Sequence, residues 1–144
     1  MKYEFTGLTK SFYGVTVRQI KRISDGVIGG WIESEKNLDQ DGDCFVYDNA
    51  VVSGNALVYG NAWVSDNARV SGNALVAGNA WVSGNASVYG NAWVYGDAVV
   101  SGNALVSGNA WVSGNASVYG DAVVTGNARV SGNASVSGNE VVTD

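Results

Sequence analysis

Most of the chain alternates small aliphatic residues with polar ones in a strict six-residue period. The unit reads x-(Gly/Asp)-(Asn/Asp)-Ala-x-Val and recurs sixteen times without an insertion, from YDNAVV at 47–52 to SGNEVV at 137–142. DGDCFV at 41–46 fits as a seventeenth unit with Cys44 in the Ala position, and EKNLDQ at 35–40 is a candidate for a decayed eighteenth. An unbroken short period of this kind is typical of a solenoid, so it bears on the fold before any other feature.

Each unit predicts a short two-sided strand followed by a turn. Ala56 and Val58 face one side and the intervening Leu57 the other, because successive side chains of a strand point to opposite faces. The next pair, Gly60-Asn61, supplies turn residues, since Gly and Asn tolerate the left-handed backbone region. Two-residue corners at every step favour a coil of short strands, each stacked on a strand of the next turn.

The inward positions predict a narrow prism with three walls. All sixteen units end in Val and fifteen carry Ala two positions earlier, which makes a thin core. Three units per coil give 18 residues per turn, so the sixteen units form a little over five coils, each rising by about 4.8 Å. We therefore expect an all-β parallel β-helix, a triangular solenoid of 18-residue coils.

The N-terminal segment differs from the repeat and holds five of the eight basic residues. KYEF at 2–5 and VTVRQI at 15–20 are strand-like, and the intervening GLTKSFYG reads as a loop. We predict a small N-terminal β-hairpin cap over the first coil, because an open solenoid end templates aggregation. Trp31 is expected to plug that coil. The chain thus divides into a cap at 1–34 and a β-helix at 35–144.

The outward positions carry the variable residues of the repeat, and those 18 apart share a wall. Aromatic and aliphatic side chains gather on two neighbouring walls and form the candidate interaction surface. One wall contributes Phe45, Tyr47, Trp63 and Trp81, and the other contributes Leu57, Tyr59, Leu75, Trp93, Tyr95 and Trp111. Exposed aromatic area on this scale is typical of an interface or a ligand surface.

Two simpler origins of these aromatic columns stay open. Cross-strand aromatic pairs stabilise a sheet by about 0.2–1 kcal/mol each, so the Trp residues can serve the fold alone. Residues 71–90 also recur nearly unchanged at 101–120, an offset of 30 that is not a multiple of 18. Such a copy rotates onto another wall, so part of the pattern is a by-product of duplication.

Composition and charge narrow the range of functions. The net charge of −5 disfavours nonspecific nucleic-acid binding, which needs clustered Lys and Arg. The chain has no His to act as a base or ligand, and a single Cys44 allows no internal disulfide. No apolar run approaches the ~20 residues of a membrane helix, and no secretory core segment is present. We expect a cytoplasmic protein without membrane or nucleic-acid partners.

The repeat unit, with an inward Val58 and a small Ala62 four positions later, resembles the hexapeptide-repeat superfamily of left-handed parallel β-helices. The resemblance implies the left hand and, from the enzymes of that superfamily, assembly as a trimer. GGWIESEKNL at 29–38 resembles the leader of hexapeptide-repeat proteins from bacterial and prophage genomes, many of them named acetyltransferases on fold alone. This second resemblance implies a phage or prophage setting in a bacterial host cell.

No catalytic site carries over from the superfamily. Its acyltransferases use a His as general base and its γ-class carbonic anhydrases bind zinc through three His, whereas this chain has none. Asp48 and Asp66 lie 18 apart at one corner, but two carboxylates alone are a poor cation site. Arg18, Lys21 and Arg22 form a cluster that could meet an anion, although a solvated strand face fits it better. We predict no catalytic residue, no metal site and no cofactor.

These observations favour a non-catalytic binding or scaffold protein, associated with a phage or prophage, that acts through its aromatic outer walls. The expected partner is a protein, for example a host factor that is blocked, or a second copy of the chain, with a trimer favoured. Two alternatives remain open. One is a carbohydrate-binding β-helix in which Trp and Tyr stack on sugar rings, and the other is an unusual acyltransferase-like protein without the catalytic His.

Overall fold

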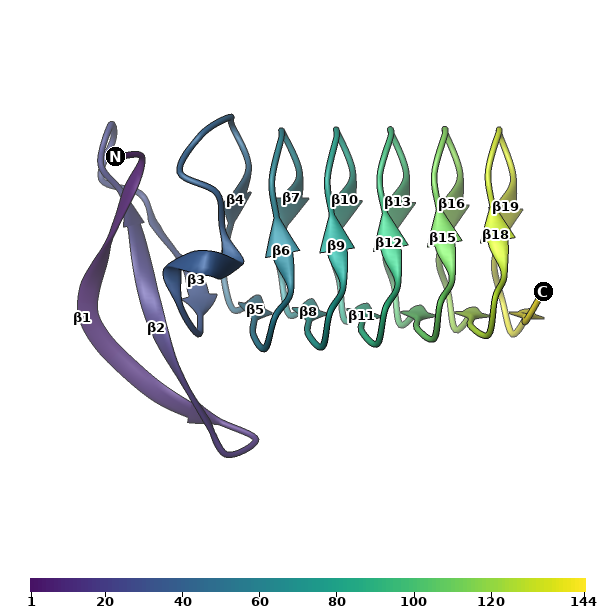
Figure 1. Ribbon diagram of the computed structural model, residues 1–144, viewed down its shortest axis with the longest axis horizontal. Helices are drawn as coiled ribbons and strands as arrows, with labels where there is room; N and C mark the ends of the chain where they lie inside the picture. Colours follow the sequence, from purple (N-terminus) through teal and green to yellow (C-terminus); the bar gives the residue numbers. More distant parts are fainter.

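Seventeen two-residue strands, β4 to β20, follow one another at the six-residue spacing in the computed structural model, which describes residues 1–144. Each strand pairs in parallel with the strand one coil away, as Leu57 does with Leu75, so the coil is 18 residues long. The strands form three walls around one axis, with the two termini at opposite ends (Figure 1). The predicted all-β parallel solenoid is confirmed, and the six-stranded wall marks about six turns.

We name the three walls A, B and C. Wall A contains β3 (Ile28–Ile32), β5 (Val51–Val52), β8 (Arg69–Val70), β11 (Ser87–Val88), β14 (Leu105–Val106), β17 (Val123–Val124) and β20 (Val141–Val142). Wall B contains β6 (Leu57–Val58), β9 (Leu75–Val76), β12 (Trp93–Val94), β15 (Trp111–Val112) and β18 (Arg129–Val130). Wall C contains β4 (Phe45–Val46), β7 (Trp63–Val64), β10 (Trp81–Val82), β13 (Val99–Val100), β16 (Ser117–Val118) and β19 (Ser135–Val136). A single 3-10 turn, η1 (Glu35–Asn37), lies between β3 and β4 in the chain.

Columns of Val and Ala fill the interior of the prism. From Ala50 to Ala128 these inward residues are at most 1% exposed. Each fully buried Val contributes roughly 1.5–3 kcal/mol through the apolar surface that it removes from water. Because the inward residues repeat, the backbone of every coil follows the same path. The outward positions of successive coils therefore lie directly above one another.

The corners stack as tightly as the walls. Gly96 has a φ of 69°, and a Cβ there would lie 2.9 Å from the backbone nitrogen of Gly114. The neighbouring Asn side chains form ladders in which each Nδ2 donates to the Oδ1 one coil on, as from Asn91 to Asn109 at 3.1 Å. Asp97 accepts such a bond at 3.0 Å but has no amide proton to pass on, so the ladder stops there. Backbone and side chains together fix the register at each corner.

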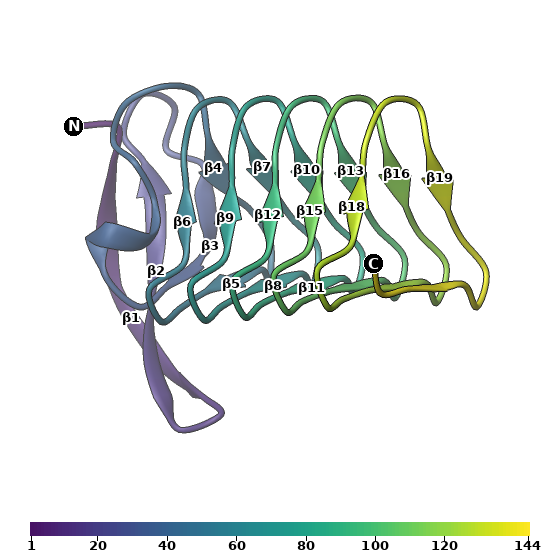
Figure 2. The same cartoon turned by 45° about the vertical axis from the view of Figure 1, so that its right-hand side comes forward.

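The N-terminal hairpin is longer than the sequence indicated. Strand β1 (Tyr3–Phe12) runs through most of the expected loop and pairs antiparallel with β2 (Val15–Arg22). A two-residue turn at Tyr13-Gly14, with positive φ at both positions, closes the hairpin, as the twist of paired strands favours. The loop prediction was wrong because a bulge next to Gly7 lets the ladder continue past that glycine. The closed end of the hairpin projects past wall A (Figure 2).

The hairpin closes the first coil with side chains other than Trp31. The residues that fill the core at this end are Tyr3, Ile20, Ile32 and Leu38. Trp31 lies instead on the outer face of wall A beside Val51, with Lys10 Nζ 4.3 Å from its ring centre. The plug assignment was wrong because β3 is itself a wall strand, paired with both β2 and β5, which turns Trp31 outward.

Cys44 occupies the inward small-residue position of the unit at 41–46 and is fully buried. Lys2 lies beside it, and the Nζ donates to the Cys44 carbonyl oxygen at 2.6 Å and to Sγ at 3.2 Å. Burial raises the pKa of the Cys44 thiol above its ordinary value, against the opposing effect of the Lys2 ammonium. The thiol is therefore a neutral part of the core at pH 7.

We predict that Gly96→Ala destabilises the protein by about 1–2 kcal/mol more than Gly132→Ala. Both substitutions place a Cβ on a residue with positive φ, which costs roughly 1–2 kcal/mol in either case. Only the Cβ at position 96 meets the next coil, whereas position 132 has nothing within 4 Å. Chemical unfolding followed by circular dichroism measures both changes. Equal losses of stability in the two variants would show that contact between stacked corners does not restrict these positions to Gly.

We predict that the free energy of unfolding falls as the pH rises above about 9, and that Cys44→Ala flattens this fall. The unfolded thiol ionises near its ordinary pKa while the folded thiol resists, so the unfolded state loses the proton first. The slope is at most about 1.4 kcal/mol per pH unit for one group.

The difference between wild type and Cys44→Ala isolates the thiol in such unfolding curves, since Ala is the residue of the later units. Burial also raises the pKa of Tyr3, which lowers stability at higher pH in both proteins. The charge of the Cys44 thiolate adds to this rise in wild type alone. Parallel curves for the two proteins between pH 8 and pH 10 would contradict the prediction.

Candidate functional site

The first aromatic column runs up wall C. Trp63 stacks on Tyr47 with ring centres 4.5 Å apart and an interplanar angle of 27°, and Trp81 follows Trp63 at 5.3 Å. Trp63 is 40% and Trp81 is 51% exposed, so both rings reach the solvent. Val99 is the next residue of this column, and the stack therefore ends at Trp81.

Phe45 was predicted to belong to this exposed surface, and that assignment was wrong. Phe45 is only 1% exposed, although it pairs with Trp63 in wall C as expected. The cap covers its ring, because Gly29 of β3 lies so close that a Cβ there would be 2.7 Å from the ring edge. The exposed part of the column starts at Tyr47.

The second aromatic column runs up wall B. Trp93 and Trp111 are parallel to within 4°, with ring centres 5.0 Å apart. Arg129 follows in the same column, with its guanidinium carbon 4.5 Å from the ring centre of Trp111. Tyr95 forms T-shaped pairs with both indoles, at 76° to Trp93 and 75° to Trp111. The backbone spacing between coils thus sets the stacking distance of the rings.

A hollow of about 360 Å³ opens beside this column, where wall B turns towards wall C. It is lined by Tyr59, Leu75, Ala77, Gly78, Trp93, Tyr95 and Gly96. Tyr59, Ala77 and Tyr95 occupy the same position of three successive coils. Because Ala77 replaces a ring between two tyrosines, a space open to solvent is left above it.

The structure brings together the predicted wall B residues, and Leu57 lies one coil before Leu75 in the same column. Sequence reasoning missed the residues that give this surface its shape and its charge. Ala77 forms the floor of the hollow, and Arg129 covers one end of the stack. Reading every outward column 18 residues at a time would have found both, because Ala77 interrupts a run of Tyr and Arg129 continues a run of Trp.

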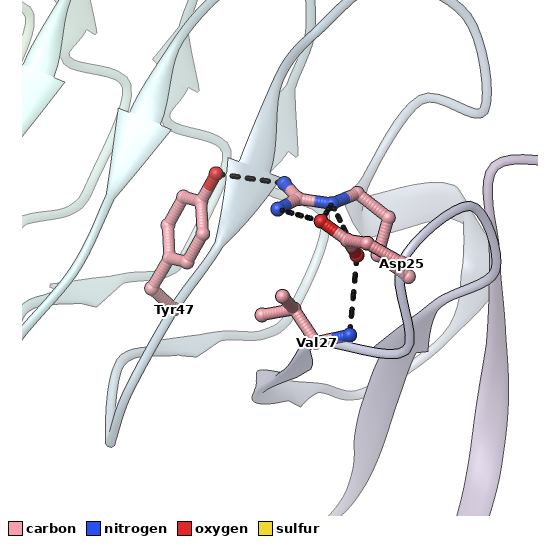
Figure 3. A network of polar contacts seen from close by, with 4 residues as sticks. Asp25, Val27 and Tyr47 are labelled. Carbon is pink, nitrogen blue, oxygen red and sulfur yellow. Dashed lines mark hydrogen bonds and ion pairs between the residues drawn. The ribbon is translucent and has the colours of Figure 1, made fainter.

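The basic residues of the cap do not converge on an anion site. Arg22 donates to both carboxylate oxygens of Asp25 and, from Nη1, to the hydroxyl of Tyr47 at 2.9 Å (Figure 3). The guanidinium lowers the pKa of the Asp25 carboxyl, to which the Val27 N–H also donates. Lys21 Nζ forms an ion pair with a carboxylate oxygen of Glu4 at 3.6 Å. The guanidinium carbon of Arg18 lies 5.3 Å from the ring centre of Phe5.

Asp48 and Asp66 are explained by the fold. Both have a φ of 57° in place of a corner Gly. A carboxylate oxygen of Asp48 accepts from the backbone N–H of Asp66 at 3.2 Å, and one of Asp66 accepts from the N–H of Gly84 at 3.0 Å. The structure holds no cluster of three or more His, Cys, Asp or Glu side chains suited to a metal ion, and no helix long and apolar enough to cross a membrane.

The central coils match a family model described as the YdcK β-solenoid repeat, at residues 52–66, 68–84, 80–96, 86–102 and 98–114. A 65-residue stretch is 42% identical to the protein named uncharacterized acetyltransferase YdcK of Escherichia coli K12. The comparison covers 40% of this chain and 19% of the relative, so the chain spans about a fifth of the relative's length. The leader at 29–38 lies outside the residues that the family model matches. Its resemblance to leaders of bacterial and prophage hexapeptide-repeat proteins therefore stays a prediction. The chain is thus a hexapeptide-repeat-like β-helix protein whose central coils are similar to those of the YdcK solenoid.

Proposed function

We propose that this protein is a non-catalytic binding protein that docks on a partner protein through the aromatic columns of walls B and C. One observation carries the proposal: two Trp pairs in ring contact lie on neighbouring walls, with Trp63, Trp81 and Trp93 each at least 40% exposed. Trp and Tyr are the residues that most often dominate the binding energy of interfaces. Exposed Trp rings lower the solubility of the protein, and exposed aromatic area on this scale is typical of a binding surface.

The rigidity of the columns supports the same function. Trp93 and Trp111 are each attached to a strand that pairs on both sides, and they hold one another parallel. A partner that binds to a prearranged surface avoids the loss of side-chain freedom, which otherwise costs about 0.5–1.5 kcal/mol per side chain. The phage or prophage setting inside a bacterial cell, with a host factor as the partner, belongs to this proposal through the leader at 29–38.

Acetyl transfer is the activity in the printed name of the relative, and we propose that this chain does not perform it. A transferase needs a group that removes a proton from the acceptor, and His is the commonest such group. The chain has no His, and the hollow on wall B is lined by aromatic, aliphatic and Gly residues. Calorimetric titration with acetyl-CoA checks this. The proposal would be overturned if wild type gave a saturable heat of binding and Trp93→Ala gave none.

We predict that Trp93→Ala combined with Trp111→Ala weakens partner capture by about 30-fold or more, since a central interface residue contributes 2 kcal/mol or more. Affinity capture from bacterial lysate identifies the partner, and titration of the purified partner measures the change. The matched control combines Tyr89→Ala and Tyr119→Ala, which removes two rings that are 41% and 45% exposed and belong to neither column.

Self-association and sugar binding are separated from this outcome by two further measurements. Light scattering reports whether wild type forms a discrete oligomer that the Trp pair variant loses, in which case the partner is a second copy of the chain. A glycan array read by tryptophan fluorescence tests the carbohydrate alternative. If both double variants capture the partner as wild type does, the aromatic columns are not the docking surface.

A further inference from the structure

A cation covers one end of each aromatic column within this molecule. Arg129 lies over Trp111 at the C-terminal end of the wall B stack, 4.5 Å from the ring centre. Arg22 lies over Phe45 and Tyr47 at the N-terminal end of the wall C column, at 5.0 and 5.6 Å. A positive charge is attracted to the face of an aromatic ring by the negative potential of the π-system. The fold itself therefore covers open ring faces with basic side chains.

One ring face of the wall B stack has no such cover. Trp93 has Trp111 on one side and Leu75 on the other. The hollow is lined by Leu75 and Trp93 but not by Trp111, so it opens on the Leu75 side of the indole. Trp93 is 40% exposed and lines the hollow, so part of its indole is accessible to a ligand there.

Two tyrosines complete the surroundings of this face. Tyr95 stands at 76° to Trp93, with ring centres 6.4 Å apart, and Tyr59 lies on the other side of Ala77, two coils before Tyr95. Three aromatic rings thus surround one small floor, and the face of each ring carries a negative potential. Proteins recognise alkylammonium groups with aromatic cages of this kind.

The charge of the solenoid favours the same ligand. Residues 41–144 contain eight Asp and Glu against two Arg, which gives a net charge of −6. Both arginines, Arg69 and Arg129, already lie over rings of the chain itself. No basic side chain lines the hollow, so nothing there opposes a cation or attracts an anion.

We propose that this hollow is an aromatic cage that receives a Lys or Arg side chain from a basic surface of the partner protein. The inference rests on the proposed function, because it names the chemistry by which the partner is recognised. The cation lies beside the wall B column, against Trp93 on its Leu75 side, and the acidic solenoid guides a basic partner to it.

The test uses small probes on the full-length protein, followed through the indole N–H signals of ¹⁵N-labelled Trp. The probes are the N-acetyl methylamides of lysine and arginine, choline, and 3,3-dimethylbutanol, which has the shape of choline without its charge. We expect the Trp93 signal to shift with the three cations, with millimolar dissociation constants, and not with the neutral alcohol at the same concentration.

Two variants locate the cage. Ala77→Tyr fills the hollow with the residue that the preceding and following coils carry at this position. The substitution leaves the fold and every existing ring in place. It should weaken cation binding by about tenfold or more. Tyr89→Ala removes an exposed ring that does not line the hollow and should leave cation binding unchanged. Binding of the alcohol as tight as that of choline would show an apolar pocket, and a shift with glucose but not with the cations would show a sugar site. Either result overturns the cage.

Partner capture separates this inference from the proposed function. If Ala77→Tyr captures the partner as wild type does while the Trp93, Trp111 variant does not, the walls bind the partner and the cage proposal fails. If lysine binds in the hollow but neither Ala77→Tyr nor the Trp93, Trp111 variant alters partner capture, the hollow is a cation site that the partner does not use, and the proposed function fails. Loss of capture in both variants supports both.

Discussion

Every coil of this protein must lie in register on the one before it, and nearly all other features follow from that constraint. Backbone N–H groups donate to carbonyls of the next coil along the walls and at the corners alike, as from Leu57 to Ala74 and from Asn61 to Gly78. Such bonds form only if successive coils have the same length and shape. The sequence therefore repeats every six residues, and insertions are absent from 47 to 142.

The same constraint explains why the outer face can be functional at no cost to the core. Inward Val and Ala are fixed by the narrow prism, and corner Gly and Asn by stacking, so only the outward positions are free to vary. Because those positions superpose, two Trp residues placed 18 apart must lie in contact, as Trp93 and Trp111 do at 5.0 Å. A small residue placed between two large ones must leave a hollow, as Ala77 does between Tyr59 and Tyr95.

The periodic part of the structure could be predicted from the sequence because each unit repeats the same local solution. The coil length, the wall to which each outward residue belongs and the burial of Cys44 all follow from counting in sixes. The cap could not be predicted this way. Whether a strand continues past Gly7, and whether Trp31 turns inward or outward, depends on pairing between β2, β3 and β5, which no period specifies. Phe45 was misplaced for the same reason, since the cap that covers it is not part of the repeat.

Duplication accounts for one part of the wall B surface and not for another. Residues 71–90 and 101–120 are identical except at one position, where Ala77 corresponds to Ser107. Trp111 is the copy of Trp81, and an offset of five units moves it from wall C to wall B, where it lies on Trp93. The stack can therefore arise from copying alone.

The hollow has no such origin. Ser107 is only 7% exposed and its hydroxyl contacts Thr125 Oγ1 at 3.1 Å, so the copied segment forms no equivalent cavity. An open ring face needs Ala77 flanked by tyrosines one coil away on either side, and that combination occurs once in the chain. The one residue that distinguishes the two copies is the floor of the hollow, which makes the hollow, more than the Trp stack, the feature by which to judge whether this wall binds a ligand.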